Sequence, residues 1–509
     1  MRTKNSIKNL IFALFGQAFG LIISFLGRIV FVKILTDEYL GLNSLFTNIL
    51  TMLSLVELGV GSAIVYSLYK PLAVNDKEKI KSLMLLYKKA YTLIGIIIML
   101  LGIISLPFYR YLINEVPNIK NLDLIYFLFV LNTSVSYFYS YKRSLIISDQ
   151  KRYIATIYRY GFYFILNVVQ IIVLLITKNY LLFLIVQVIF TWLENVFVSI
   201  KADKMYPYLK EKKVEKLKTT ELKKIKQNIN AMLFHKIGGV VINSTDNILI
   251  AKFIGLVSVG LYSNYYLIIN ALEIIIIQFF NAIVASIGNL GATRKNSEVK
   301  ETFDITLFIN FVIFGVSSIC LLILFNPFIK IWLGKKYVFD FSIVLVIVIC
   351  FYLKGIRKTC LTYKDALGFF KEDKYKPVIE SIINLVSSII LAKYLGLLGI
   401  FLGTVISTLT TSIWIEPYVL YKYYFKTSIM DYFKRVFKYV LVTIISYLVA
   451  LTLCNLVNIN EMVNLIIKLI ICLIIPIILY IICFAYFLYR LAKWSIVYYW
   501  KYLFTQRNF

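Results

Sequence analysis

The stretch KIGGVVINSTDNILIAKF, residues 236–253, is apolar enough to lie in a lipid bilayer, but it contains five polar residues in a row, NSTDN. The acid of this run, Asp246, would cost about 2.5 to 3.5 kcal/mol near the centre of a membrane helix. We therefore expect this face of the helix to contact protein or a water-filled cavity and not lipid.

The whole chain has the composition of a membrane protein. Its 509 residues are 60% hydrophobic and have a mean hydropathy of +0.81, whereas soluble globular chains are only about half apolar. Apolar runs of about 18 or more residues, the length that crosses a hydrocarbon core, recur along the sequence. We predict an all-α polytopic membrane protein with fourteen transmembrane helices, at residues 10–32, 41–69, 84–107, 122–141, 154–175, 181–200, 230–251, 259–288, 303–325, 341–363, 378–392, 399–420, 439–456 and 464–489.

The formal charge of +29 is distributed unevenly. If the N-terminus is cytoplasmic, the inner segments between spans hold 37 Lys and Arg and the outer segments hold 9. This asymmetry follows the positive-inside rule and predicts that both termini are cytoplasmic. The charge is thereby explained without a nucleic-acid partner.

The sequence contains an internal repeat. When position i is aligned with position i + 219 without a gap, residues 4–53 meet residues 223–272 with thirteen identities, among them Gly41 with Gly260. The shift corresponds to six spans, an even number, so both copies enter the membrane in the same direction. In transporters built from such parallel repeats, the substrate site lies between the halves.

The repeat predicts two six-helix lobes with a central cavity, followed by two additional helices. The basic linker between the lobes carries three apolar residues at helical spacing, which indicates either an amphipathic helix on the inner leaflet or a solvated loop. The expected parts are an N-terminal lobe with spans 1–6 (1–200), a basic cytoplasmic linker (201–229), a C-terminal lobe with spans 7–12 (230–420), and spans 13–14 with a basic cytoplasmic tail (421–509).

Polar and ionisable side chains inside the spans are the candidate substrate or cavity residues, because such groups within a membrane are functional by default. Glu57 lies midway along the second span, and the repeat relates it to position 276, three residues after Glu273. The repeat also relates Arg28 to Asn247. The candidate residues are Arg28, Glu57, Lys236, Asn243, Asp246, Asn247, Glu273 and Arg357.

Structural roles are the alternative for these residues. The polar stripe around Asp246 would also serve as a seam that joins two helices by hydrogen bonds. Charged residues nearer the inner ends of spans would also reach the interface by snorkelling. This second group consists of Arg159, Glu194, Lys354, Arg357, Lys358 and Glu416.

Three stretches resemble a known family. They are LVELGVGSAIVYSLYKPLA (55–73), KIGGVVINSTDNILIAKFIG (236–255) and GLYSNYYLIINAL (260–272). These stretches look like the bacterial polysaccharide (oligosaccharide) flippases of the multidrug, oligosaccharidyl-lipid and polysaccharide (MOP) exporter superfamily. The resemblance covers most of the chain and is weakest after about residue 430.

The resemblance implies two lobes around a cavity, alternating access, and a cargo of oligosaccharide repeat units on an undecaprenyl diphosphate carrier. Such a protein moves its cargo from the cytoplasmic to the outer leaflet of the bacterial inner membrane for surface polysaccharide synthesis. Because Arg and Lys bind diphosphates well, Arg28, Lys236 and Arg357 are candidate contacts. We expect a monomer in contact with membrane lipids, and Na⁺ or H⁺ as the candidate coupling cation.

Other functions remain open. A multidrug and cation antiporter of the same superfamily would favour carboxylates in its cavity, and a peptidoglycan-precursor flippase is a third reading. An integral-membrane glycosyltransferase or polymerase is disfavoured, because the sequence shows no metal-holding carboxylate cluster, no phosphate-cradling glycine loop and no nucleophile triad. We therefore predict a transporter and not an enzyme, with no cofactor and no metal.

Overall fold

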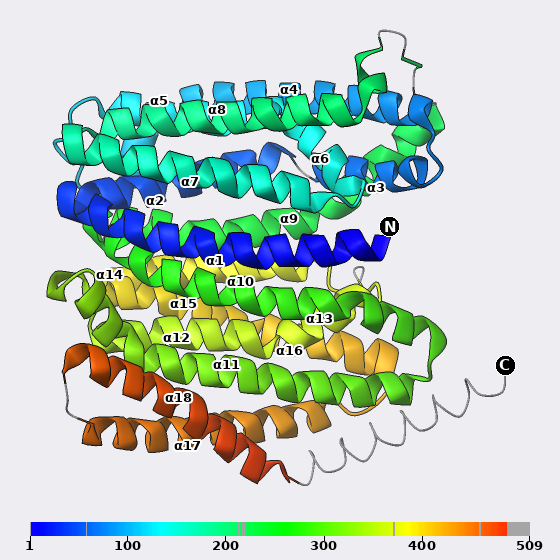
Figure 1. Cartoon of the computed structure of the whole chain (residues 1–509). Helices are drawn as coiled ribbons and strands as arrows, with labels where there is room; N and C mark the ends of the chain where they lie inside the picture. Colours follow the sequence, from blue (N-terminus) through cyan, green and yellow to red (C-terminus); the bar gives the residue numbers. More distant parts are fainter. Residues whose placement is uncertain are drawn as a thin grey trace. The chain divides into compact units, whose positions relative to one another are not determined.

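A computed structural model describes residues 2–485, apart from 58, 212–213, 216, 218, 370–371 and 458–459. The side chains of 2–7, 10, 62, 224, 227–228, 230–243 and 285 lie outside this description as well. Every regular element in the described part is a helix, which confirms the all-α prediction (Figure 1).

Contacts divide the chain into two compact units, Met1–Ser263 and Asn264–Phe509, here called unit 1 and unit 2. Helix α10 (Leu256–Thr293) crosses the boundary. The predicted division into lobes at the linker stays a prediction. The other helices of unit 1 are α1 (Arg2–Ile34), α2 (Asp37–Leu53), η1 (Ser54–Glu57), α3 (Val60–Ala73), α4 (Lys77–Ser105), η2 (Tyr109–Leu112), α5 (Leu122–Phe138), α6 (Ser140–Ser148), α7 (Arg152–Thr177), α8 (Tyr180–Met205), η3 (Pro207–Lys210) and α9 (Thr219–Phe253).

Unit 2 continues with a second series of helices and ends with the pair α17 and α18. These helices are α11 (Asn296–Trp332), η4 (Lys335–Tyr337), α12 (Phe341–Ile356), α13 (Lys358–Ala366), α14 (Lys376–Leu395), α15 (Leu397–Thr410), α16 (Ser412–Val419), η5 (Leu420–Phe425), α17 (Met430–Leu456) and α18 (Glu461–Cys483).

In the described residues, eleven helices are long and apolar enough to cross a membrane, or twelve if the bent pair α5 and α6 forms one span. Two further predicted spans, 230–251 and 341–363, correspond to α9 and to α12 with α13. Helix α12 has 16 residues, fewer than the about 20 that a spanning helix needs. The chain is a multi-pass membrane protein, and the number of fourteen spans stays a prediction.

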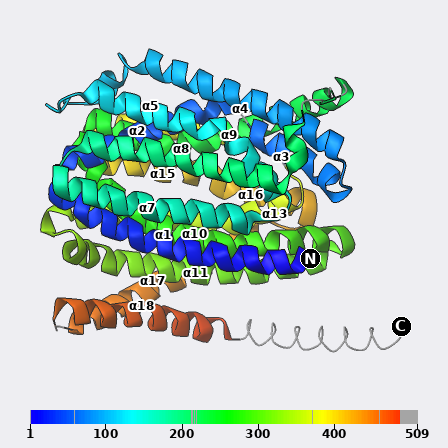
Figure 2. The same cartoon turned by 45° about the horizontal axis from the view of Figure 1, so that its top comes forward.

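Within unit 1, α1 lies along α7, and α5 lies between α4 and α8 (Figures 1 and 2). Helix α2 packs against α9. A cluster of buried apolar side chains, which includes Tyr87 and Leu145, joins α3, α4, α6 and α8. Within unit 2, α11 packs against α12, α17 and α18 around a second core that includes Phe303 and Tyr363.

The described part of the linker packs against unit 1. Ile225 is buried and Leu217 is partly buried against the apolar cluster of this unit. Lys81 of α4 forms an ion pair with Glu211 at 2.7 Å, and Lys79 forms one with Glu221. Two of the three apolar residues in the linker therefore contact protein, and the choice between a helix on the leaflet and a solvated loop stays a prediction.

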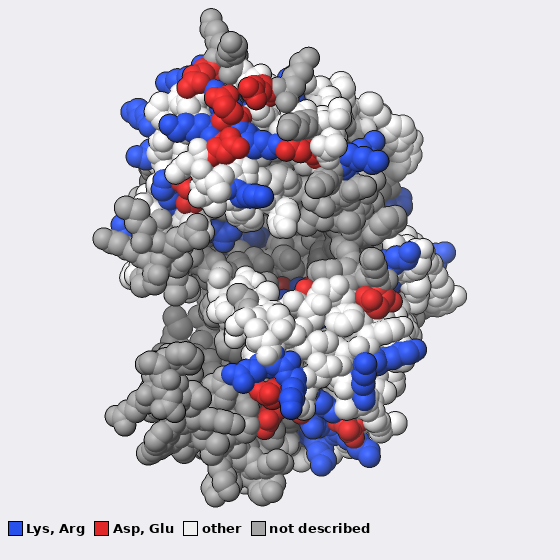
Figure 3. Space-filling view, turned by 90° about the vertical axis from the view of Figure 1, so that its right-hand side faces the viewer, with Lys and Arg blue, Asp and Glu red and all other residues white. Residues whose placement is uncertain are grey.

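Charged side chains of both signs lie beside each other on the face shown in Figure 3. Ion pairs of this kind in unit 1 join Lys142 to Asp203 and Lys151 to Asp149, both at 2.7 Å. These pairs neutralise part of the basic excess, and the pair of Lys142 and Asp203 also joins α6 to α8.

The duplicated glycines meet in unit 1. A β-carbon on Gly41 would lie 2.0 Å from the carbonyl oxygen of Leu256, and a β-carbon on Gly260 would lie 2.9 Å from the carbonyl oxygen of Asp37. Both 260 − 41 and 256 − 37 equal 219, the repeat shift. The contact is thus reciprocal, as in a twofold-symmetric interface, and it requires glycine at both positions.

Candidate functional site

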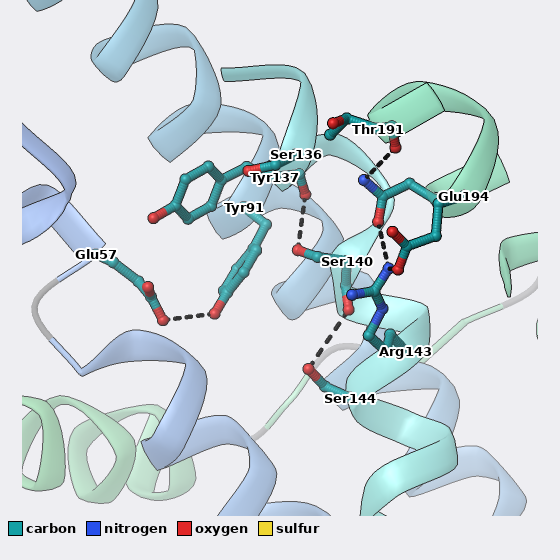
Figure 4. A pocket seen from close by; sticks show the side chains of 10 residues that line it. Glu57, Tyr91, Ser136, Tyr137, Ser140, Arg143, Ser144, Thr191 and Glu194 are labelled. Carbon is teal, nitrogen blue, oxygen red and sulfur yellow. Dashed lines mark hydrogen bonds and ion pairs between the residues drawn. The ribbon is translucent and has the colours of Figure 1, made fainter. Parts of the chain in front are cut away.

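Unit 1 contains a polar cavity of about 330 Å³ that is partly open (Figure 4). Its walls come from η1, α4, α5, α6 and α8. The lining residues are Glu57, Tyr91, Ser136, Tyr137, Ser140, Arg143, Ser144, Thr191, Glu194 and Asn195.

Two helix breaks create this cavity. Gly59, with a left-handed φ of 82°, separates η1 from α3, and Tyr139 separates α5 from α6, which are bent by 45°. Glu57 lies just before the first break, and Ser140 and Arg143 lie just after the second. Irregular backbone at membrane depth is tolerated where it lines a cavity or is buried in protein, and interrupted helices mark binding sites in transporters.

The cavity lies at the level of the helix centres. Tyr91 is the middle residue of α4, and Glu194 lies near the middle of α8. Charged groups at such positions are costly unless protein or water surrounds them. Protein surrounds Glu194 here, since its side chain is 19% exposed and pairs with Arg143.

A hydrogen-bonded chain forms one wall. The Tyr91 hydroxyl donates to Glu57 Oε1 at 2.7 Å, and the Tyr87 hydroxyl lies 3.0 Å from Ser144 Oγ and 3.3 Å from the Tyr91 hydroxyl. A β-carbon on Gly61 would lie 2.1 Å from the Tyr91 hydroxyl and 2.7 Å from Glu57 Oε1. The missing side chain at Gly61 therefore makes room for the bond between Glu57 and Tyr91.

An ion pair forms the opposite wall. Arg143 Nη2 donates to Glu194 at 2.6 Å and to Asn195 Oδ1 at 3.1 Å, and Asn195 Nδ2 donates to the carbonyl oxygen of Thr191 at 3.0 Å. Figure 4 shows Arg143 and Glu194 next to each other and Glu57 paired with Tyr91. The site offers hydroxyl groups, an amide and charges, which suits the binding of a polar ligand.

Unit 2 contains a second charged cluster, which is filled by its own side chains. Arg357 follows α12 and donates to Glu380 at 2.9 Å and to Glu416 at 2.6 Å. Lys376 also contacts Glu416. The side chains of Glu416, Glu380 and Lys376 are 0%, 3% and 5% exposed, so this is a buried network of two acids and two bases.

The two clusters occupy related positions in the repeat. The helix breaks at Tyr139 and Arg357 differ in number by 357 − 139 = 218, and Glu194 and Glu416 differ by 416 − 194 = 222, both close to the shift of 219. Each unit therefore pairs an arginine at or after a broken helix with a glutamate of a later helix.

Six of the eight predicted site residues have described side chains. Glu57 lines the cavity of unit 1. Arg28 of α1 donates to Ser263 Oγ at 2.9 Å. Asp246 and Asn247 are half-buried in α9. Glu273 of α10 pairs with Lys354 at 2.8 Å, and Arg357 belongs to the buried network. Lys236 and Asn243 lie outside the described side chains.

The snorkelling alternative is wrong for Glu416, which is fully buried between Arg357 and Lys376. It fits Lys354, whose side chain is 55% exposed.

Sequence analysis misses Arg143 as a site residue, because the apolar runs place it in a loop. The repeat does not point to it either, because 143 + 219 = 362 and Thr362 stands at that position. No group of three or more His, Cys, Asp or Glu in the described part of the chain is placed to hold a metal ion.

No protein-family model and no curated protein sequence matches the chain. Solved structures do match it. The lipid II flippase MurJ in its inward closed conformation is 17% identical, with a TM-score of 0.65, over 95% of this chain and 100% of that chain. An inward-facing multidrug resistance MATE family transporter of the MOP superfamily is 14% identical, with a TM-score of 0.61, over 77% of this chain and 91% of that chain.

The Vibrio cholerae MATE transporter VcmN in the bent form is 12% identical, with a TM-score of 0.54, over 84% of this chain and 98% of that chain. At such identities the likeness shows the fold alone. The chain is a polytopic membrane protein whose fold resembles that of these flippase and transporter structures.

Proposed function

We propose that the chain is a flippase that moves undecaprenyl-diphosphate-linked oligosaccharide units from the cytoplasmic to the outer leaflet of a bacterial inner membrane by alternating access. The carrying observation is the match to a lipid II flippase over 95% of this chain and 100% of that chain. The resemblance of residues 55–73, 236–255 and 260–272 to polysaccharide flippases supports an oligosaccharide as the class of cargo.

The extent of the match favours a flippase over a drug exporter. Helices α17 and α18 contain 27 and 23 residues. The flippase match covers 95% of this chain, and the part outside it is only about half as long as this helix pair, so part of the pair has a counterpart in the flippase. The two MATE transporters match only 77% and 84% of the chain, and in each case the part outside the match is long enough to contain the whole pair.

The candidate residues fit such a cargo. Arg28, with Lys236 nearer the cytoplasm, would attract the diphosphate, since cations bind phosphate oxygens strongly. Asp246 would position this positive field or accept a coupling cation. The hydroxyl-lined cavity of unit 1 would contact the glycan. The 37 to 9 distribution of basic residues supports cytoplasmic termini for this proposal.

Two alternatives have specific support. The MATE likeness and the carboxylates Glu57 and Glu194 in the cavity favour a cation-coupled multidrug exporter. The lipid II flippase likeness favours a peptidoglycan precursor as the cargo. Neither accounts as directly for the resemblance to polysaccharide flippases.

Deletion of the gene tests the proposal. We expect lipid-linked oligosaccharide to accumulate at the inner leaflet while surface glycan is lost, and the wild-type gene to restore display. Arg28→Ala and Asp246→Asn should fail to restore it at matched membrane abundance. Accumulation of lipid II instead, or loss of drug resistance with normal glycan display, would replace the proposed cargo by one of the alternatives.

A further inference from the structure

The cavity of unit 1 carries an excess of negative formal charge. Among its ten lining residues are two carboxylates, Glu57 and Glu194, and one basic side chain, Arg143. Arg143 and Glu194 neutralise each other at 2.6 Å. Glu57 accepts from the neutral hydroxyl of Tyr91, and no described Lys or Arg forms an ion pair with it. One carboxylate of the cavity is therefore left without a cation from the described residues.

The other lining groups are neutral and both donate and accept hydrogen bonds. They include Ser136, Ser140, Ser144, Thr191 and Asn195. A ligand rich in hydroxyl groups matches such a surface, because each hydroxyl offers one donor and two acceptor lone pairs. The volume of about 330 Å³ lies at the lower end of the about 300 to 1,000 Å³ found for small-molecule pockets. The cavity thus has the size for one sugar ring.

We propose that this cavity binds a sugar residue with a free ammonium group, with the ammonium at Glu57 and the sugar hydroxyls at the serine and asparagine side chains. This inference rests on the proposed function, which supplies a sugar-bearing cargo. A carboxylate has about four lone-pair sites. The hydroxyls of Tyr91 and Tyr137 bond to Glu57, so it retains acceptors for an ammonium. An acidic sugar would be repelled by the same carboxylate.

The Glu57 carboxylate is preorganised for such a ligand. Tyr91 fixes one carboxylate oxygen at 2.7 Å, and the absence of a side chain at Gly61 leaves both groups undisturbed. A fixed acceptor loses little conformational freedom on binding, which favours affinity. A hydrogen bond from an ammonium to the Glu57 carboxylate would be charge-assisted, and such bonds are stronger than those between neutral groups.

Binding to the full-length protein in lipid nanodiscs tests the proposal, with saturation-transfer NMR or calorimetry as the readout. The probes are glucosamine, glucose, N-acetylglucosamine and cyclohexylamine. We expect glucosamine to bind about tenfold more tightly than glucose or N-acetylglucosamine, the effect of one charge-assisted hydrogen bond. Cyclohexylamine has the ammonium but no hydroxyl groups and should bind more weakly than glucosamine.

Glu57→Gln keeps the shape of the side chain and an acceptor for Tyr91, and it should abolish the preference for glucosamine while glucose binding stays the same. Asp123→Asn is the matched control. It removes a carboxylate that pairs with the exposed Arg110 at 2.8 Å and does not line the cavity, so it should leave the preference intact.

Several results would overturn the proposal. These are equal binding of glucosamine and glucose by the wild-type protein, cyclohexylamine binding as tight as that of glucosamine, or an unchanged preference in Glu57→Gln. The wild-type comparison needs no variant to fold. If deletion of the gene left glycan display normal, the proposed function would fall, whereas the binding measurement would still decide which chemistry the cavity recognises.

Discussion

Each unit contains a charged cluster beside a broken helix, but the surroundings of the two clusters differ. In unit 1, the arginine and glutamate near the broken helix, Arg143 and Glu194, border a cavity, and Glu57 across from them has only hydroxyl partners among the described residues. In unit 2, Arg357 and Glu416 are joined by Glu380 and Lys376, so that each charged group has a partner of opposite sign within the cluster. The two clusters therefore differ in their surroundings, because the first borders a cavity and the second is filled by its own side chains.

The difference concerns how each unit satisfies its charged side chains. A charge at membrane depth must be paired or hydrated. Unit 2 satisfies its charges internally, so the network fixes α12, α14 and α16 relative to one another. In unit 1, Glu57 has no cationic partner among the residues whose side chains are described, and the proposed ligand would supply one.

Removal of Glu416 should produce the largest effect. Glu416→Ala leaves Arg357 and Lys376 as buried bases with a single remaining acid, Glu380, and loss of one partner of a buried pair costs about 3 to 5 kcal/mol. Glu194→Ala should cost less, because Arg143 is 25% exposed and retains Asn195 as a partner. Denaturant titration in mixed micelles measures both free energies of unfolding. Equal losses of unfolding free energy in Glu416→Ala and Glu194→Ala would show that the cluster of unit 2 does not stabilise the fold more than that of unit 1.

Gly61→Ala tests how tightly the wall of the cavity is packed. The added methyl group would collide with the Tyr91 hydroxyl and Glu57 Oε1, and overpacking of this kind costs about 1 to 3 kcal/mol. Gly161→Ala, in a helix with open space around the added carbon, is the matched control. It should be neutral or slightly stabilising, since alanine favours helix over glycine by up to about 1 kcal/mol. If Gly61→Ala and the control had the same free energy of unfolding, the side chains of Tyr91 and Glu57 would be able to move aside for the added methyl group.

Much of the fold was predictable from the sequence, because the apolar runs and the repeat are encoded locally. The shift of 219 relates the glycines at 41 and 260 without any structure. It does not predict their contact, because a repeat states which positions are equivalent and not which ones touch. The structure shows that these glycines approach each other's helix.

The candidate site was only partly predictable. Glu57 stands out in the sequence because it is an acid inside an apolar run. Its neighbours in the cavity do not, because the pair Arg143 and Glu194 is separated by 51 residues, and the pair Arg357 and Glu416 by 59. Hydropathy places each residue along the membrane normal, but it does not say which helices are neighbours, and the pairing of charges depends on those neighbours.

The smallest effect is expected for the ion pair between Lys354 and Glu273. Glu273 lies three residues before position 276, to which the repeat relates Glu57. Lys354 is 55% exposed, so its ammonium can reach water without its partner. Exposed ion pairs contribute about 0 to 1 kcal/mol, and Lys354→Ala should therefore lower the free energy of unfolding by less than about 1 kcal/mol. The same micelle titration as for Glu416→Ala gives the value on one scale. A loss as large as that of Glu416→Ala would place Glu273 in a buried network of its own, and unit 2 would then contain two closed clusters where unit 1 has an open cavity.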